Sequence, residues 1–253
     1  MSTPQAGARA RPGFAGWALI VLRSLSLVLW LLLMLPVFAP FKILTPRNPI
    51  PRLFFIGVNH ILGLRIVLRG VRLRRGVFLI ANHVSWLDIP ALGAVTGTAF
   101  IANDGLAAHG WLQWLCRLND TVFVARHDRA SVKRQVEQVR EAIGENGALT
   151  IFAEGGTSDG SAVLPFKSSL LSALTPVPAR VAVHPVLLDY GRDTASIAWV
   201  GEEHGGHSYL KIAARWRPLR MTVHLLPALA EADLADRKRI AAAAHAALSR
   251  LRG

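Results

Sequence analysis

Cysteine and acidic residues are both scarce in this chain of 253 residues. A single cysteine, Cys116, excludes an internal disulfide framework and any zinc site built from several cysteines. It lies in the apolar stretch WLQWLCRL, which favours a buried, unreactive thiol. Aspartate and glutamate together number 16 against 29 lysines and arginines, so the net charge is +13. Such a field attracts anionic lipids, nucleic acids or acidic ligands, although an arginine-rich proteome produces the same balance.

Charged residues of either sign make up only 18% of the chain, whereas 52% of its residues are hydrophobic. The mean hydropathy of +0.35 is high for a soluble enzyme and indicates contact with a membrane. We expect a basic disordered tail over residues 1–13, a membrane anchor over residues 14–41 and one further domain over residues 42–253. The apolar part of the anchor after Arg23 matches one leaflet in depth, so a half-inserted anchor is preferred over a single span. A signal peptide is a third interpretation, but no small-x-small cleavage site follows the segment.

Short apolar runs alternate with segments of helical pattern from about residue 53 onward. A loop precedes them, predicted by Pro36, Pro40, Pro46, Pro49 and Pro51. The apolar runs predict strands at 64–70, 76–81, 98–102, 121–125, 148–153, 181–188 and 221–226. Helices are predicted at 86–95, 105–117, 128–146, 166–174 and 231–251. This alternation is typical of an α/β fold, so we expect a mostly parallel mixed sheet flanked by helices, with an N-terminal apolar anchoring helix.

The segment LIANHVSWLDIPAL (79–92) places a histidine and an aspartate at a predicted junction between a strand and a helix. On a continuous helix the side chains of His83 and Asp88 would point about 140° apart. If Ser85 caps the helix, His83 falls in the preceding loop and Asp88 points back toward it. The carboxylate would then fix the imidazole tautomer and leave the second ring nitrogen as a base. From these two residues alone, a helix-capping aspartate beside an uninvolved histidine is the favoured interpretation.

A second segment, TIFAEGGTSDG (150–160), favours a functional site over a simple helix cap. Here Glu154 ends a predicted strand and is followed at once by Gly155 and Gly156. Successive glycines allow backbone N–H groups to approach an anion closely. If both strands end at one edge of the sheet, the two segments border a crevice, which is the usual ligand site of open α/β sheets. The alternative is a flexible surface turn.

Four segments, in order along the chain, carry a resemblance to a known family. NHVSWLD (82–88) resembles the Asn-His-x4-Asp block of the glycerolipid acyltransferases, the lysophosphatidic acid acyltransferase family. DTVFVAR (120–126), FAEGGTS (152–158) and VHPVLL (183–188) resemble that family's second, third and fourth blocks. The resemblance implies an enzyme that moves a fatty acyl chain from CoA or acyl carrier protein to the hydroxyl of a lysolipid. It implies no metal, no further cofactor and no covalent enzyme intermediate.

The resemblance also implies a bacterial enzyme of the inner membrane at its cytoplasmic face. The apolar N-terminus and the arginine excess agree with an anionic membrane as partner, and no motif indicates nucleic acid. His83 would be the general base for the acceptor hydroxyl, and Asp88 would orient it. The substrate-binding residues would be Arg126, Glu154, Gly155, Gly156, Thr157 and Lys167. Arg126 would hold an anionic head group. Lys167 would meet an acceptor carboxylate or the donor's phosphates, unless it lies on a solvated helix face.

The third segment departs from the family pattern. Thr157 stands where the family has an arginine that contacts phosphate, and Gly156 and Ala153 replace threonine and proline. An uncharged side chain cannot make the bidentate contact that suits phosphate. TSDG followed by VLPFKSSL is similar to a bacterial branch that acylates lyso-ornithine lipid, an aminolipid without phosphorus. The commonest family assignment makes 1-acyl-sn-glycerol-3-phosphate the first expected acceptor and lyso-ornithine lipid the alternative. A non-catalytic membrane lipid-binding protein is the alternative of another class.

Overall fold

A seven-stranded sheet forms the centre of the computed structural model, which describes residues 12–45, 48–103, 110–124, 132–201 and 203–252. The strand order is β1-β7-β6-β2-β5-β3-β4. The bounds are β1 Leu64–Gly70, β2 Val77–Ala81, β3 Ala99–Asn103, β4 Val122–Val124, β5 Ala148–Phe152, β6 Ala182–Asp189 and β7 Leu219–Leu225. Every neighbouring pair is parallel except β6 and β7. The predicted mostly parallel, mixed sheet is therefore confirmed.

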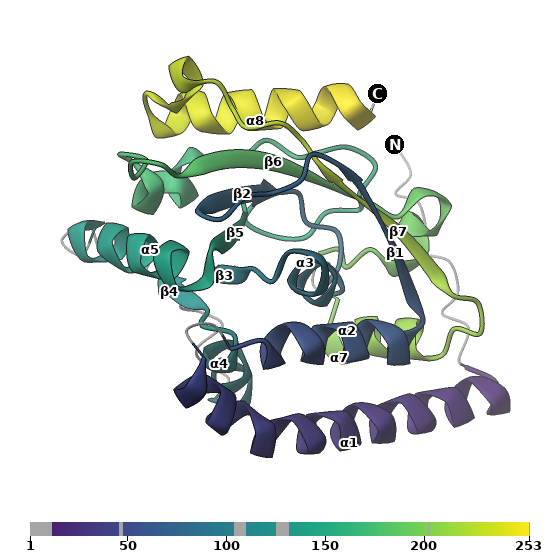
Figure 1. Cartoon of the computed structure of the whole chain (residues 1–253). Helices are drawn as coiled ribbons and strands as arrows, with labels where there is room; N and C mark the ends of the chain where they lie inside the picture. Colours follow the sequence, from purple (N-terminus) through teal and green to yellow (C-terminus); the bar gives the residue numbers. More distant parts are fainter. Residues whose placement is uncertain (1–11, 46–47, 104–109, 125–131, 202, 253) are drawn as a thin grey trace, which may run out of the picture.

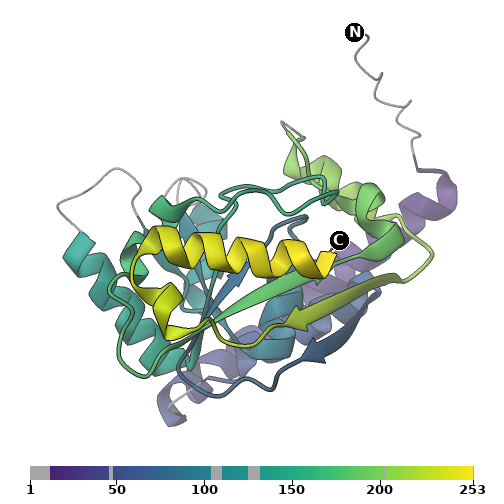
Figure 2. The same cartoon turned by 90° about the horizontal axis from the view of Figure 1, so that it is seen from above.

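Helices cover both faces of this sheet (Figure 1). Their bounds are α1 Phe14–Leu44, α2 Ile50–Leu62, α3 Asp88–Thr96, α4 Gly110–Leu118, α5 Val132–Asn146, α6 Thr194–Ile197, α7 Gly205–Ala213 and α8 Arg237–Arg252. One core cluster joins α2, α3 and α7 to one face of the sheet, and the other joins α5 and α8 to the opposite face. Seen from above, α8 lies across the strands (Figure 2). Helix α1 thus lies on the side of the molecule opposite to α8.

Several predicted helices differ in type or extent from those observed. Residues 168–174 form a 3₁₀ helix rather than the predicted α-helix, and the predicted tail helix begins with a 3₁₀ turn at Glu231–Leu234 before α8. The beginnings of the helices predicted at 105–117 and 128–146 lie outside the described residues. So do residues 1–11 of the predicted disordered tail. Helices α2, α6 and α7 had no sequence prediction.

The loop predicted from the five prolines is wrong in most of its length. Helix α1 continues through Pro36 and Pro40 as far as Leu44, beyond the expected end of the anchor at residue 41, and Pro51 lies in the first turn of α2. A proline in the first turn costs no helical hydrogen bond, since the N–H there has no partner within the helix. Apolar helices in contact with a membrane also tolerate internal proline better than soluble helices do. Pro46 lies outside the described residues.

Helix α1 lies along the folded domain, beside α2 and α7 (Figure 1). Arg23 Nη1 donates to the carbonyl of Arg215 at 2.9 Å, the hydroxyls of Ser24 and Tyr209 are 2.7 Å apart, and Trp30 Nε1 donates to a carbonyl of α2. The opposite side of the helix is exposed and apolar, and Ile20 is its one fully buried residue. Among the described helices, α1 is the one long and apolar enough to cross a membrane.

The register of the central strands places the site. All five residues of β2 are buried, and Ala81 at its end is paired with Phe152 of β5 and with Val186 of β6. The three strands are parallel, so the residues that follow β2 and β5 leave the sheet side by side. The two segments singled out from the sequence, 82–88 and 153–160, therefore meet at one edge, as expected.

Candidate active site

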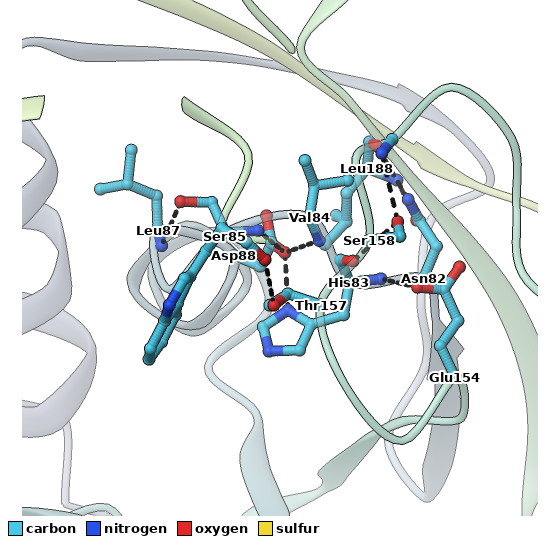
Figure 3. Close-up of polar contacts among 12 residues, drawn as sticks. Asn82, His83, Val84, Ser85, Leu87, Asp88, Glu154, Thr157, Ser158 and Leu188 are labelled. Carbon is cyan, nitrogen blue, oxygen red and sulfur yellow. Dashed lines mark hydrogen bonds and ion pairs between the residues drawn. The ribbon is translucent and has the colours of Figure 1, made fainter. Parts of the chain in front are cut away.

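His83 and Asp88 contact each other at this edge (Figure 3). His83 lies in the loop after β2, and Asp88 is the first residue of α3. The Nδ1 atom of His83 is 2.7 Å from Oδ2 of Asp88. A carboxylate in this position accepts the Nδ1 proton, so the neutral imidazole has its lone pair on Nε2. The proximity predicted from the sequence is thus present.

The loop reaches this geometry without the predicted Ser85 cap. Helix α3 begins at Asp88, with Leu87 in the N-cap position. The carboxylate of Asp88 accepts hydrogen bonds from the backbone N–H groups of Val84 at 2.7 Å and Ser85 at 2.9 Å. The residues before the helix therefore wrap around the carboxylate, which delays the start of the helix by two residues relative to the prediction at 86. The contact with the Ser85 N–H is still the one expected of a capping carboxylate.

Tyr190 completes the environment of Asp88. Its hydroxyl donates to Oδ1 of Asp88 at 2.7 Å, and both residues are buried. Burial, and next the charge of Asp88, raises the pKa of Tyr190 well above its ordinary value, so the hydroxyl keeps its proton and acts as the donor. Sequence reasoning missed this residue. The available signal was a tyrosine two residues after the predicted strand VAVHPVLL, which corresponds to β6, the neighbour of β2 in the sheet.

The imidazole of His83 is held on its face as well as at its edge. The ring stacks on Phe152, with centroids 4.0 Å apart and an interplanar angle of 15°. The side chain is 16% exposed. Within the described part of the chain, Nε2 makes no hydrogen bond, so this nitrogen is the one open to a substrate proton. A positioned base of this kind can remove the proton of an alcohol, which is a poor nucleophile without such help.

Glu154 holds the backbone of His83 from the neighbouring loop (Figure 3). One carboxylate oxygen accepts from the His83 N–H at 3.0 Å and the other from the Leu164 N–H at 2.9 Å. The residue is 3% exposed, and burial raises the pKa of its carboxyl despite these two hydrogen bonds. One oxygen thus links the two loops, and the other holds the loop after β5 together. The substrate-binding role implied by the resemblance stays a prediction.

Two more contacts hold the loop after β2, which carries His83. The side chain of Asn82 bonds both the N–H and the carbonyl of Leu188 in β6, at 2.8 and 3.1 Å. The N–H of Ser158 donates to the carbonyl of His83 at 2.8 Å. The loop that carries the histidine is therefore bonded to the segments on both of its sides.

The glycine turn after Glu154 is more open. Gly155 has φ +75°, and a Cβ atom built on it would lie 3.0 Å from Nζ of Lys167. A side chain would strain this backbone and crowd the lysine. Gly156 is exposed, and the half-buried Thr157 donates its hydroxyl to the carbonyl of Trp199. The structure therefore brings the Lys167 ammonium, itself on an exposed residue, to the glycine turn.

Two other predictions from the sequence have different outcomes. Arg126, the expected head-group ligand, lies outside the described residues. Cys116 is half-buried rather than fully buried, and burial raises the pKa of its thiol, which disfavours the reactive thiolate.

Within the described residues, no group of three or more histidine, cysteine, aspartate or glutamate side chains is placed to hold a metal ion.

Comparison with known proteins agrees with this geometry. Residues 63–189, which include both loops, match the protein family described as Acyltransferase. The chain belongs to this acyltransferase family. It is 32% identical over 194 residues to a lyso-ornithine lipid O-acyltransferase of Rhodobacter capsulatus, which covers 74% of this chain and 70% of the relative. It is 35% identical over 106 residues to a 1-acyl-sn-glycerol-3-phosphate acyltransferase of Neisseria meningitidis, 42% of each chain.

A solved structure shows the same fold. The crystal structure of the 1-acyl-sn-glycerophosphate acyltransferase of Thermotoga maritima superimposes with a TM-score of 0.67 and 19% identity, covering 94% of both chains. The protein is an acyltransferase with an α/β fold, in which the loops after β2 and β5 form the candidate active site.

Proposed function

We propose that the protein transfers a fatty acyl chain from a thioester, carried by CoA or acyl carrier protein, to the hydroxyl of a lysolipid. The observation that carries the proposal is the 2.7 Å contact between His83 and Asp88 in a chain of this family. Nε2 of His83 takes the hydroxyl proton while the oxygen attacks the thioester carbonyl. The tetrahedral adduct then expels the thiolate, which receives the proton from the imidazolium. Asp88 stabilises that imidazolium, and the products are an ester lipid and a free thiol.

Lyso-ornithine lipid is the acceptor that we propose, with 1-acyl-sn-glycerol-3-phosphate second. This reverses the order expected from the sequence. The lyso-ornithine lipid enzyme of Rhodobacter capsulatus covers 74% of this chain, against 42% for the Neisseria meningitidis enzyme. Thr157 also offers no charge where the family has a phosphate-binding arginine, and its hydroxyl is already bonded to Trp199. The ammonium of Lys167 at the glycine turn suits the carboxylate of an amino-acid head group.

The test of the acceptor is a competition. The purified protein receives both lysolipids at equal concentration with one acyl thioester, and kcat/KM is measured for each. We expect a preference for lyso-ornithine lipid. Thr157→Arg should raise kcat/KM for 1-acyl-sn-glycerol-3-phosphate by about 10-fold or more, because a guanidinium can bond phosphate through two N–H groups.

Thr157→Ser is the matched control, since it keeps the hydroxyl that bonds Trp199. It should leave the preference unchanged. A wild-type preference for the phosphate acceptor would contradict the assignment of the acceptor, although not that of acyl transfer. Unchanged kcat/KM for that acceptor in Thr157→Arg would contradict the role given to position 157.

We further propose that α1 inserts into one leaflet of the inner membrane from the cytoplasmic face. It is tied to the domain at Arg23, Ser24 and Trp30, so it cannot cross a bilayer without drawing the domain in. Single cysteines placed at Phe14 and at Leu44, in a Cys116→Ser background, test this. Both ends should react with a membrane-impermeant thiol reagent in inverted membrane vesicles, whereas a span would expose only one of them. Retention on vesicles at high salt would exclude attachment by charge alone.

A further inference from the structure

Five arginines surround a cavity of about 630 Å³, which we call the arginine cavity. Its lining comprises Arg65, Arg192, Arg215, Arg217 and Arg220, together with Asp193 and Pro218. Arg65 of β1 and Arg220 of β7 are register partners, so their side chains leave the sheet on the same face. The other arginines come from the segment after β6 and from the turn between α7 and β7. Segments distant in the sequence thus bring positive charge to one place.

The charge of the arginine cavity is unbalanced. Its one carboxylate, Asp193, is paired with Arg215 at 2.9 Å. Among the residues that the structure describes, no carboxylate pairs with any of the other four arginines, and Nε of Arg215 is buried without a hydrogen-bond partner. Like charges at this density repel one another, so a bound anion would relieve the repulsion. Phosphate, like carboxylate, fits the guanidinium fork through two parallel N–H groups.

The position of the arginine cavity indicates where that phosphate comes from. Arg23 of α1 reaches the carbonyl of Arg215 itself, which places the cavity beside the anchor. The neighbours of Arg23 on the helix, Leu22 and Leu25, are 60% and 64% exposed. Trp216, between two of the arginines, is 70% exposed, and tryptophan is enriched at the boundary between membrane and water. The Arg215 side of the cavity therefore lies next to the anchor, where exposed apolar residues give way to positive charge.

We propose that the arginine cavity binds the phosphate of an anionic bilayer lipid that is not the substrate, and that this contact fixes how the enzyme sits on the membrane. The α7–β7 turn, adjacent to the N-terminal half of α1, would lie against the head groups (Figure 1). The inference depends on membrane insertion of α1 but not on the reaction catalysed. Lipid is favoured over a soluble phosphate donor because Trp216 and the exposed face of α1 border the site.

The test compares two variants of the full chain that lose the same number of positive charges. Arg65→Gln, Arg217→Gln and Arg220→Gln are combined in one, and Arg237→Gln, Lys238→Gln and Arg250→Gln on α8 in the other. Partition is measured onto vesicles of phosphatidylcholine, with and without phosphatidylglycerol. The cavity variant should lose about 10²-fold of the wild-type preference for anionic vesicles, at about fivefold per cation near the surface. The α8 variant, whose three substituted residues do not line the cavity, should lose less than about threefold because of screening.

Three results would overturn the proposal. Equal losses in both variants would mean that total charge alone attracts the protein. A cavity variant that keeps its preference for anionic vesicles but needs more acyl-CoA would mean that the cavity binds the donor. No anionic preference in the wild type would mean that no such site exists. The melting temperatures of both variants show that they are folded, and vesicle partition is measurable even if the proposed acyl transfer to lysolipids fails.

Discussion

The loop after β2 and the loop after β5 meet at the same edge of the sheet but differ in how fully their polar groups are enclosed. In the first, Asp88 is fully buried and accepts from His83, two backbone N–H groups and Tyr190. In the second, Glu154 is buried, whereas Gly156 beyond it is exposed and has open space around its Cα. The proton-transfer pair is thus fixed by many contacts, and the part expected to meet the acceptor is free to vary. Thr157 lies beyond Glu154 and outside the contacts that fix the pair.

The largest effect should come from His83→Ala, which removes the proposed base and leaves the enclosing contacts of Asp88 otherwise intact. We expect kcat to fall by about 10³-fold, since general bases of this kind contribute on the order of 10²–10⁴. The measurement is acyl transfer to the preferred lysolipid, with vesicle binding as a second readout that should not change. His245→Ala on α8 is the control and should keep its activity. Full activity in His83→Ala would refute the mechanism.

Asp88→Asn should give the next largest loss, about 10²-fold in kcat, at the lower end of what a positioned base contributes, with little change in KM for the acceptor. The amide can keep an oxygen toward the Val84 and Ser85 N–H groups, so the loop should hold its shape. What is lost is the charge that stabilises the imidazolium. Asp236→Asn at the start of α8 is a matched change of a hydrogen-bonded carboxylate. A variant as active as wild type would show that Asp88 serves only to shape the loop.

The parts of the fold and site that could be predicted are those encoded locally. Strand β2 is a run of five apolar residues that is buried throughout, and His83 and Asp88 lie within one short segment. The contact of Tyr190 with Asp88 spans 102 positions, and that of Glu154 with the His83 N–H spans 71. Such contacts follow from the order of strands in the sheet, which the sequence pattern does not specify. Helix α2 was missed because Pro49 and Pro51 suggested a loop where they instead begin a helix.

Glu154→Gln tests whether the second loop supports the first. An amide offers one acceptor where the carboxylate has two, so the N–H of His83 or of Leu164 would face a donor. We expect the free energy of unfolding to fall by about 1–3 kcal/mol, measured by denaturant titration. Glu137→Gln, on the exposed face of α5, should change it by less than about 0.5 kcal/mol. Equal values for both variants would show that the link between the loops contributes nothing.

The pH dependence of stability gives a second test of Glu154. Burial raises the pKa of its carboxyl above the ordinary value of 4.5. The folded protein therefore keeps this proton to a higher pH than the unfolded chain does, and stability from this group falls as pH rises from 4.5 through the raised value. Glu154→Gln should lack that decline. The same slope in both proteins would mean that another group causes it.

Tyr190→Phe should have the smallest effect, about a 10-fold loss of kcat, because it removes one hydrogen bond to a charged acceptor and little packing. Without the tyrosine, Oδ1 of Asp88 loses its side-chain donor, and the carboxylate holds His83 less firmly. kcat should therefore fall while KM for the acceptor stays unchanged, a split that a general loss of packing would not give. Tyr209→Phe is the matched control: it also loses a 2.7 Å hydrogen bond, but at the contact between α1 and α7. If the two variants have the same kcat, Tyr190 does not act through Asp88, and the hydrogen bond between them contributes nothing to catalysis.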